Sequence, residues 1–535
     1  MKKSQILFLI SLFIISACGG TGTPSADTSS SSIIDDSSII TSSETSESRG
    51  ESIVSSEEPS SEIIVTSEER SSEVVSSRED ASSIESSSEE VEKLNPMNEP
   101  YVHQQYYLNH IGDIYNTWKS YTGKGVTIAV IDIGFNPNHQ DFFYKDGTSK
   151  ISDKSASFTS VKNKSTKQWT TTKVEGIDAV INMGESHGTF CAGVAAAAVN
   201  GKGVTGIAPD ASLLLLKTDA KPRSIAEAFK YAADQGAKVV TISIGSYYNY
   251  GGDLDNDESD LSTVFNAPVQ YCLNKGTVVI SAGGNGGLDG NQTEWTFPGA
   301  TTGVIGVGGL KANSSDAVWE GSSYNYNKSS QFCDVFAPAN LMYGMCHFNR
   351  DGKYYTYDGG WNGTSFASPI VAGIAALYFE KNPNNTPSQF ETDLYNSCTK
   401  LKAQYVGDTY LNASQLGNGR VDVGKLLGTD CKDTITIKIK YNGSTLYAFG
   451  WDNAGVNAFA GADWPGKKLT KSGDYYSVTI DSSKYQNIIF NGGNNTFQTV
   501  DLLTSSFCFN NIYNLASKNL PIDLTSAYIA PYIAS

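Results

Sequence analysis

Apolar runs of two kinds alternate along the middle of the chain. Residues 126–132 form a β-branched apolar run that ends in a carboxylate, Asp132. Because such a run is apolar on both faces, it predicts a fully buried parallel strand. Residues 192–198 and 367–379 are rich in small apolar residues, which predicts buried helices that pack closely. This combination predicts an α/β fold in which helices flank a parallel sheet.

The pattern changes after about residue 430. Residues 433–440 alternate strictly between polar and apolar positions, as a half-buried strand does. Three further short runs follow, separated by Gly, Asn and Asp, at residues 446–451, 475–480 and 487–490. We therefore predict a small antiparallel β-sandwich at residues 431–504. The tail, residues 505–535, has no pattern that we can assign.

The amino terminus differs from both regions. Two lysines precede an apolar run at residues 6–15, which is too short to span a bilayer comfortably and is typical of a signal peptide at residues 1–18. Residues 19–95 are rich in Ser and Glu and contain no aromatic residue. They cannot bury enough apolar surface to offset chain entropy, so we expect a disordered linker.

Charge is concentrated in this linker. The whole chain has a formal net charge of −17. Residues 19–93 hold eighteen acidic and four basic residues, and 18 minus 4 gives −14 of that total. The acidity therefore says little about a substrate, and no basic patch indicates nucleic acid. A charged linker extends by self-repulsion and would hold a folded domain away from a membrane.

Three reactive side chains stand at the ends of predicted elements. Ser365 follows Gly363-Thr364 and begins a helix, where unpaired N–H groups and the positive dipole end point at whatever the serine attacks. His187 begins another helix, and Asp132 ends the predicted strand, where open α/β sheets place ligands. Taken singly, a Ser or Asp at such a place is more often a turn or cap residue. The interpretation as nucleophile, base and orienting acid rests on all three.

The order Asp132, His187, Ser365 resembles that of the subtilisin-like serine peptidases, or subtilases. The resemblance covers about residues 104–427, and shorter landmarks agree with it: Gly206-Ile-Ala-Pro209, Ser243-Ile-Gly245, Ala337-Pro338 and Gly417-Asn-Gly-Arg-Val-Asp422. It implies a serine endopeptidase domain at residues 96–430, with a polypeptide substrate and an acyl-enzyme intermediate.

The resemblance also implies roles for single residues. Asn285 would donate to the oxyanion, together with the backbone N–H of Ser365. Ser243, Ile244 and Gly245 match the segment that pairs with the substrate backbone. The stretch between the Asp and His motifs, residues 142–184, is long, which predicts a surface insertion. Cys191 is a rival nucleophile, but its place inside a helix favours a small buried thiol.

Two acidic sites in the sequence have features of cation ligands. The hydrolysis requires no cofactor, but Asp141 resembles a calcium ligand of the family, so structural calcium is allowed. Asp253, Asp255 and Asp257 also have the spacing of cation ligands. They lack the glycine and the distal glutamate of a calcium loop, which favours an acidic surface loop.

Cys18 suggests how the chain is located. Ile15-Ser-Ala-Cys18 resembles the lipobox of bacterial lipoproteins, in which the cysteine is lipidated. This implies a membrane anchor on the outer face of the cell, and an ordinary secretory signal is the alternative. Secreted subtilases usually have a folded pro-segment where residues 19–95 lie. The composition of these residues does not fit one, so maturation stays unexplained.

The C-terminal region resembles starch-binding modules of bacterial amylases, at Trp464-Pro-Gly466, residues 487–493 and residues 498–502. Tyr447, Phe449 and Trp451 share one face of a strand by alternation. If that face is outward, with Trp464 nearby, it could hold an α-glucan, because sugar rings stack on aromatic rings. If it is inward, these residues are core. The alternative function is thus a glucan-binding surface adhesin whose subtilase domain is weak or inactive.

Eight cysteines are present. With Cys18 and Cys191 set apart, six remain, and six cysteines allow fifteen pairings. The pair Cys333–Cys346 is the first to check.

Overall fold

A computed structural model describes residues 96, 99–247, 261–289, 296–312, 314, 316–326, 332–350, 353–430, 434–452, 459, 463–493, 497–499, 502–504, 507, 512–516 and 528–531. The expected signal peptide, Cys18, the whole linker at residues 19–95 and the Asp253, Asp255 and Asp257 group lie outside these residues.

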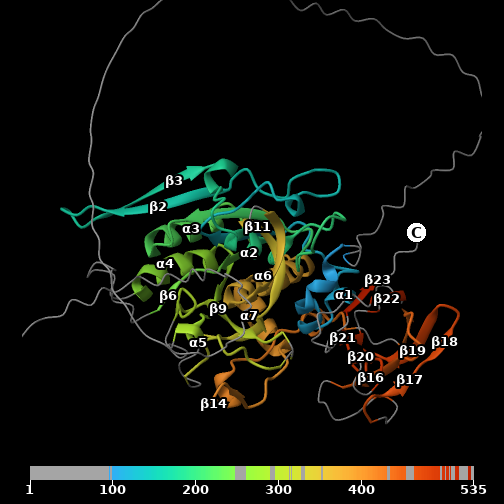
Figure 1. Cartoon of the computed structure of the whole chain (residues 1–535). Coiled ribbons are helices and arrows are strands. Elements are labelled where there is room, and N and C mark those ends of the chain that lie inside the picture. Colours follow the sequence, from blue (N-terminus) through green and yellow to red (C-terminus); the bar gives the residue numbers. More distant parts are fainter. Residues whose placement is uncertain are drawn as a thin grey trace, which may run out of the picture. The chain divides into compact units, whose positions relative to one another are not determined.

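An eight-stranded sheet forms the centre of the region between residues 99 and 430 (Figure 1). The strand order is β10-β9-β7-β5-β1-β4-β2-β3, and every neighbouring pair is parallel except β2 with β3. The strands are β1 (Thr127–Asp132), β2 (Ala156–Lys162), β3 (Trp169–Glu175), β4 (Ser212–Thr218), β5 (Val239–Ile242), β7 (Val278–Ala282), β9 (Val304–Leu310) and β10 (Val335–Pro338). The predicted parallel sheet is confirmed, and residues 127–132 are its central strand.

Helices cover both faces of the sheet. Ile128 and Val130 of β1 belong to the core shared with α2 (His187–Ala196) and α6 (Thr364–Lys381). Ala129 and Ile131, which point to the opposite face, pack in the core of α3 (Pro222–Asp234) and α4 (Leu261–Asn274). Every residue of α2 is buried, since its small side chains let the helix lie against the sheet and α6 at once.

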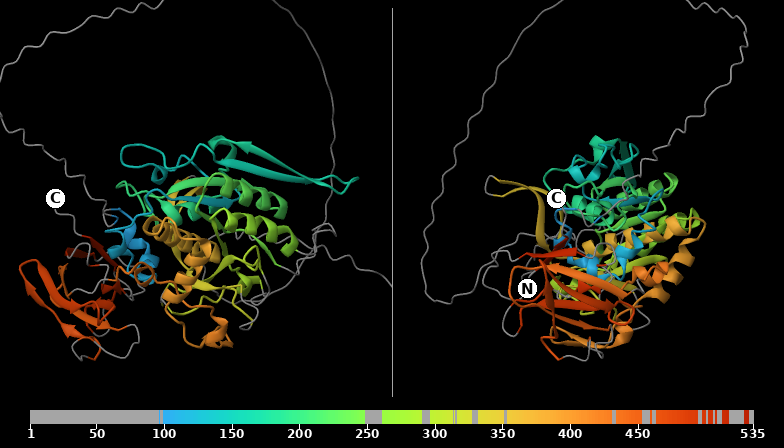
Figure 2. Two further views of the ribbon diagram at one scale, coloured as in Figure 1. Left: turned by 180° about the vertical axis from the view of Figure 1, so that it is seen from behind. Right: turned by 90° about the vertical axis from the view of Figure 1, so that its right-hand side faces the viewer.

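The long stretch at residues 142–184 builds the edge of the sheet. Its strands β2 and β3 form an antiparallel hairpin that extends past the helices (Figures 1 and 2). Most of β3 is exposed, and it carries Thr170, Thr172 and Lys173. Polar and charged side chains of this kind protect an open sheet edge from pairing with other chains.

The remaining elements of this region are short or peripheral. They are η2 (Val102–Gln104), η3 (Tyr106–His110), α1 (Ile114–Thr117), η4 (Gln140–Phe142), η5 (Ile177–Val180), β6 (Ser246–Tyr247), α5 (Gly286–Asp289), β8 (Thr296–Phe297), β11 (Met342–Arg350), β12 (Lys353–Trp361), α7 (Pro387–Ser397), β13 (Gln404–Val406), β14 (Thr409–Leu411), η6 (Ala413–Gln415) and α8 (Val423–Leu427). None of the helices in the described part of the chain has the length and apolar character needed to cross a bilayer.

Two small sheets form the C-terminal region. One has the order β18-β19-β15-β22-β23 and the other β17-β16-β20-β21. Their strands are β15 (Thr434–Lys440), β16 (Tyr447–Trp451), β17 (Lys467–Lys468), β18 (Thr470–Ser472), β19 (Tyr475–Asp481), β20 (Asn487–Asn491), β21 (Leu502–Leu503), β22 (Ile512–Ala516) and β23 (Tyr528–Pro531). The expected all-β architecture is present. The last two strands come from the tail that the sequence left unassigned, and β22 pairs with β15 in parallel.

The cysteines that the structure describes form no disulfide. Cys191, Cys272, Cys333, Cys346 and Cys398 are all buried thiols. The suggested pair Cys333–Cys346 is therefore not formed, and the Sγ of Cys333 donates instead to the carbonyl of Ser323 at 3.5 Å.

Candidate active site

The fold brings the predicted reactive residues together at the carboxyl ends of the sheet strands. Asp132 is the last residue of β1, His187 the first of α2 and Ser365 the second of α6. Strands β2, β3 and β4 lie on one side of β1 and the later strands β5, β7, β9 and β10 on the other, so the strand order reverses direction at β1. Such a switch point leaves a crevice at the carboxyl ends of the strands, where α/β proteins bind ligands.

Asp132 and His187 form a buried pair. The Nδ1 atom of His187 lies 3.0 Å from both Oδ1 and Oδ2 of Asp132. Burial alone would lower the pKa of His187, but the Asp132 carboxylate outweighs it and holds that pKa well above its usual value. With Nδ1 directed at the carboxylate, the Nε2 edge of the ring is left to receive a proton from another group.

Ser365 exchanges hydrogen bonds with Ser243. The Ser365 hydroxyl donates to the carbonyl of Ser243 at 3.1 Å, and the Ser243 hydroxyl donates to the carbonyl of Ser365 at 2.7 Å. A hydroxyl has one proton, so Ser365 does not donate to His187 in this conformation. Catalytic hydrogen bonds often form only when substrate is bound.

Cys191 lies beneath this group as a neutral thiol. It is fully buried, and burial raises the pKa of its thiol. Its Sγ is 4.0 Å from Nδ1 of His187 and donates to the carbonyl of Ser365 at 3.3 Å. These contacts support the expectation of a buried thiol that packs the start of α6. Among the described residues, only one group of three or more His, Cys, Asp or Glu side chains has its ligand atoms close enough together to hold a metal ion. It consists of Asp132, His187 and Cys191.

Asn285 is held by a residue that the sequence did not single out. Its Oδ1 accepts the backbone N–H of Thr364 at 2.9 Å and the Thr364 hydroxyl at 3.1 Å. The Thr364 hydroxyl in turn accepts the N–H of Gly284 at 3.0 Å. The amide Nδ2 of Asn285 is thus the part left to donate toward the start of α6. The signal for Thr364 was its place in Gly-Thr-Ser, immediately before the reactive serine.

The segment Ser243, Ile244 and Gly245 follows β5 and leads into β6. Gly245 packs directly on β8, since a Cβ there would lie 2.4 Å from the carbonyl oxygen of Phe297. Ser243 is therefore held against Ser365 and Gly245 against β8, with Ile244 between them.

Asp141 does not fit a calcium ligand. Its Oδ1 accepts the hydroxyl of Tyr357 at 2.8 Å and its Oδ2 accepts the N–H of Val204 at 3.0 Å. Burial raises the pKa of Asp141 to about 7, and these hydrogen bonds oppose that rise. Each carboxylate oxygen thus already accepts a donor of the chain, and one of these donors is an N–H group, which cannot be an oxygen ligand of calcium.

In the C-terminal module the predicted aromatic residues face outward. Along β16, Ala448 and Gly450 are buried, whereas Tyr447, Phe449 and Trp451 are half-exposed. The Phe449 ring centroid lies 5.8 Å from that of Trp451 and 5.7 Å from that of Trp464. Trp464 is 45% exposed. We call these four side chains the aromatic face.

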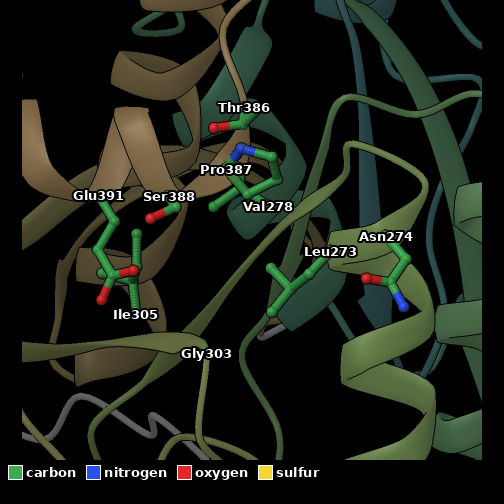
Figure 3. A pocket seen from close by; sticks show the side chains of 9 residues that line it. All are labelled: Leu273, Asn274, Val278, Gly303, Ile305, Thr386, Pro387, Ser388 and Glu391. Atoms are coloured by element: carbon green, nitrogen blue, oxygen red, sulfur yellow. The ribbon is translucent and has the colours of Figure 1, made fainter.

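A separate cavity lies at the amino ends of the strands of the main sheet. A cavity of about 160 Å³ is lined by Leu273, Asn274, Val278, Gly303, Ile305, Thr386, Pro387, Ser388 and Glu391 (Figure 3). Val278 begins β7 and Ile305 lies near the start of β9. The cavity is therefore at the opposite end of the strands from Ser365, and none of the predicted site residues lines it.

Both regions of the chain match known protein families. A model of the subtilase family matches residues 123–419, and a model of starch-binding module 26 matches residues 438–504. Thermitase of Thermoactinomyces vulgaris is 30% identical over 286 residues, which cover 52% of this chain and 84% of thermitase. Subtilisin DY of Bacillus licheniformis is 28% identical over 305 residues, covering 56% and 91%.

A solved structure of proteases from Pseudoalteromonas arctica matches 62% of this chain and 99% of its own, at 22% identity and a TM-score of 0.48. The subtilase family model spans more than half of the chain, and the alignment with thermitase covers 84% of that protein at 30% identity. The chain belongs to the subtilase family of serine peptidases and carries a starch-binding module.

Proposed function

We propose that the chain is a surface-anchored endopeptidase that cleaves peptide bonds with Asp132, His187 and Ser365 and binds an α-glucan through its C-terminal module. The observation that carries the proposal is the buried Asp132–His187 pair at the same sheet edge as Ser365 and Asn285. Membership of the subtilase family supports the same roles.

The first step is substrate binding along Ser243–Gly245. A peptide that pairs with this segment competes for the Ser243 carbonyl, to which the Ser365 hydroxyl now donates. The freed hydroxyl turns to Nε2 of His187, which removes its proton as the oxygen attacks the peptide carbonyl. Asp132 keeps the imidazole in the correct tautomer and stabilises the imidazolium that forms.

The developing negative charge is then met by two donors. Nδ2 of Asn285 is one, since its Oδ1 is held by Thr364. The backbone N–H of Ser365 is the other, because N–H groups in the first turn of a helix have no intrahelical acceptor. Donors fixed before the reaction stabilise the oxyanion without reorganisation.

The intermediate collapses when His187 gives its proton to the leaving amine, and the C–N bond breaks. The product is an ester between Ser365 and the acyl half of the substrate. Water then attacks this ester, with His187 again as the base, and releases the second product and free Ser365.

Hydrolysis of casein tests this assignment. The full chain without its signal should hydrolyse casein, and Ser365→Ala should lower kcat by about a million-fold, the loss measured when the serine of a subtilisin is removed. Ser388→Ala, an exposed serine on α7, is the matched control and should keep full activity. Equal activity of the two variants would refute the role of Ser365. No activity in the unaltered chain would favour the adhesin alternative.

We further propose that the aromatic face is the glucan-binding surface. Tyr447, Phe449, Trp451 and Trp464 point away from the core of the module, and a starch-binding family model covers them. Sugar rings have apolar faces that stack on aromatic rings, so a row of half-exposed rings suits a chain of glucose units. A starch-like α-glucan is the ligand we propose.

The proposed location is the outer face of the bacterial membrane, with Cys18 lipidated. This rests on the lipobox-like sequence Ile15-Ser-Ala-Cys18 and on the acidic linker that follows. Expression of the full chain should place it in the membrane fraction, and Cys18→Ser should release it. A protein that stays membrane-bound after this substitution would contradict the lipid anchor.

A further inference from the structure

Five consecutive backbone N–H groups, those of residues 200–204, donate to two buried carboxylates. Oε1 of Glu99 accepts from Asn200 at 2.6 Å and from Gly201 at 2.7 Å. Oε2 of Glu99 accepts from Lys202 at 3.1 Å and from Gly203 at 3.0 Å. The fifth N–H, of Val204, donates to Asp141. Glu99 is only 2% exposed, so these four bonds are its main compensation for burial.

The direction of these groups decides which ion the loop can bind. Successive N–H groups that converge form a concave site for an anion. A calcium ion instead needs six to eight oxygen ligands at about 2.3–2.6 Å. The loop also packs directly on Asp141, because a Cβ at Gly203 would lie 2.3 Å from its Oδ2 and 2.0 Å from the Tyr357 hydroxyl. Hence the loop meets Asp141 with an N–H group, and the close packing of Gly203 leaves little space for a cation between them.

Further contacts tie the same loop to the segment that carries Glu99. The N–H of Tyr101 donates to the carbonyl of Gly203 at 2.9 Å. Gln105 accepts from the N–H of Thr205 at 2.9 Å and donates to its carbonyl at 2.7 Å. The segment at residues 99–105 thus lies along the loop by both side-chain and backbone hydrogen bonds.

This network joins segments that adjoin each element carrying a proposed catalytic residue. The loop follows α2, which begins at His187, and Asp141 lies in the segment that follows β1 and Asp132. Tyr357, which donates to Asp141, is on β12, the strand that leads to α6 and Ser365. Its ring centroid lies 5.0 Å from that of Tyr101. Anchoring the loop therefore ties these three adjoining segments together.

We infer that residues 200–204 are a carboxylate-binding site whose ligand is Glu99, and that this internal anion replaces a structural calcium ion at Asp141. The peptidase domain would then need no calcium at this position. It would need Glu99 to stay joined to the rest of the domain. Cleavage of the chain just after Glu99 would remove the ligand from its site.

Thermal unfolding of inactive protein tests the inference without any role for catalysis. All variants are made in the full chain without its signal and with Ser365→Ala, so that self-cleavage does not interfere. Glu99→Ala removes the shared acceptor of four backbone N–H groups, of which only that of Lys202 keeps another, the Asn200 side chain at 3.0 Å, and should lower Tm by about 5–10 °C. Glu227→Gln, an exposed glutamate of α3, is the control and should change Tm little.

Addition of small ions identifies the chemistry of the site. Sodium acetate should restore part of the lost Tm in Glu99→Ala, compared with sodium chloride at equal ionic strength, whereas calcium should not. If Glu99→Ala does not fold, Glu99→Gln is used instead. The new side chain has the same shape as glutamate, but its NH₂ group faces two of the four N–H donors and cannot accept their hydrogen bonds. A Tm for both variants equal to that of the control would overturn the inference. So would a calcium-dependent rise in Tm of the Ser365→Ala parent that Asp141→Asn abolishes.

Discussion

The side-chain carbonyl of Asn285 accepts two hydrogen bonds from Thr364, from its N–H at 2.9 Å and from its hydroxyl at 3.1 Å. Since both bonds go to Oδ1, they fix which end of the amide is left to donate. Thr364 precedes the serine that we propose as nucleophile. The same residue therefore begins α6 and orients the side chain that we propose as the oxyanion donor.

Substitution of Asn285 and Thr364 should separate donation from orientation. Asn285→Ala should lower kcat by about 10²–10³-fold, the range measured on removing such a donor from a subtilisin. Thr364→Val keeps the backbone N–H but removes the hydroxyl, so we expect kcat to fall by roughly tenfold with little change in KM. Steady-state kinetics on a peptide substrate measures both. Thr392→Val, on the exposed face of α7, is the control, and equal kinetics of the two Val variants would contradict the orienting role.

Gly188 should tolerate no side chain. A Cβ at this position would lie 2.4 Å from the carbonyl oxygen of Gly134 and 2.9 Å from the Cβ of Asp132. Gly188→Ala should therefore push α2 away from β1 and separate His187 from Asp132, with a loss of both Tm and kcat. Gly184→Ala, whose nearest neighbour would be 3.5 Å away, is the matched control. Normal activity of Gly188→Ala would show that the two elements can move apart without cost.

The pH dependence should follow His187. The base must be neutral, and Asp132 holds the pKa of His187 above its usual value of 6.5. We therefore expect kcat/KM to rise with pH through an apparent pKa above 6.5. A raised folded pKa also means that the protonated pair stabilises the fold below pH 6.5, and that this stability is lost as pH rises through the folded pKa. Measured kcat/KM profiles that level off below pH 6.5 would contradict this.

The aromatic face should account for binding to amylose. Trp464→Ala and Tyr447→Ala, each in the Ser365→Ala chain, should reduce retardation in amylose-containing native gels, with affinity lowered by roughly tenfold for each lost stacking contact. Tyr405→Ala removes an even more exposed aromatic ring, from the peptidase domain, and should change nothing. Retardation that persists in both module variants would place the glucan elsewhere.

The linear sequence was sufficient for the parts that depend on local chemistry. The apolar run ending at Asp132 predicted the central strand, because a strand buried on both faces has few alternatives in sequence. His187 and Ser365 were found at helix starts, where both stand in the structure. The alternation of residues 433–440 likewise predicted β15.

Contacts between distant segments could not be predicted in this way. Glu99 is about a hundred residues from its loop, and nothing in its neighbours shows that four N–H groups converge on it. The tail has no assignable pattern in sequence because β22 is a strand through its pairing with β15 and β23. The pair Cys333–Cys346 was wrong as a disulfide, since the fold buries both thiols without joining them.

The sequence by itself thus determined the family, the order of the reactive residues and the two kinds of domain, because these follow from residue type and spacing. Only the tertiary structure decided that the aromatic residues of β16 face outward, that Thr364 orients Asn285 and that donors surround Glu99 and Asp141. The physical reason is that alternation assigns residues to one face of a strand but does not say which face the core covers. A carboxylate in sequence likewise does not reveal whether N–H groups or a cation will meet it.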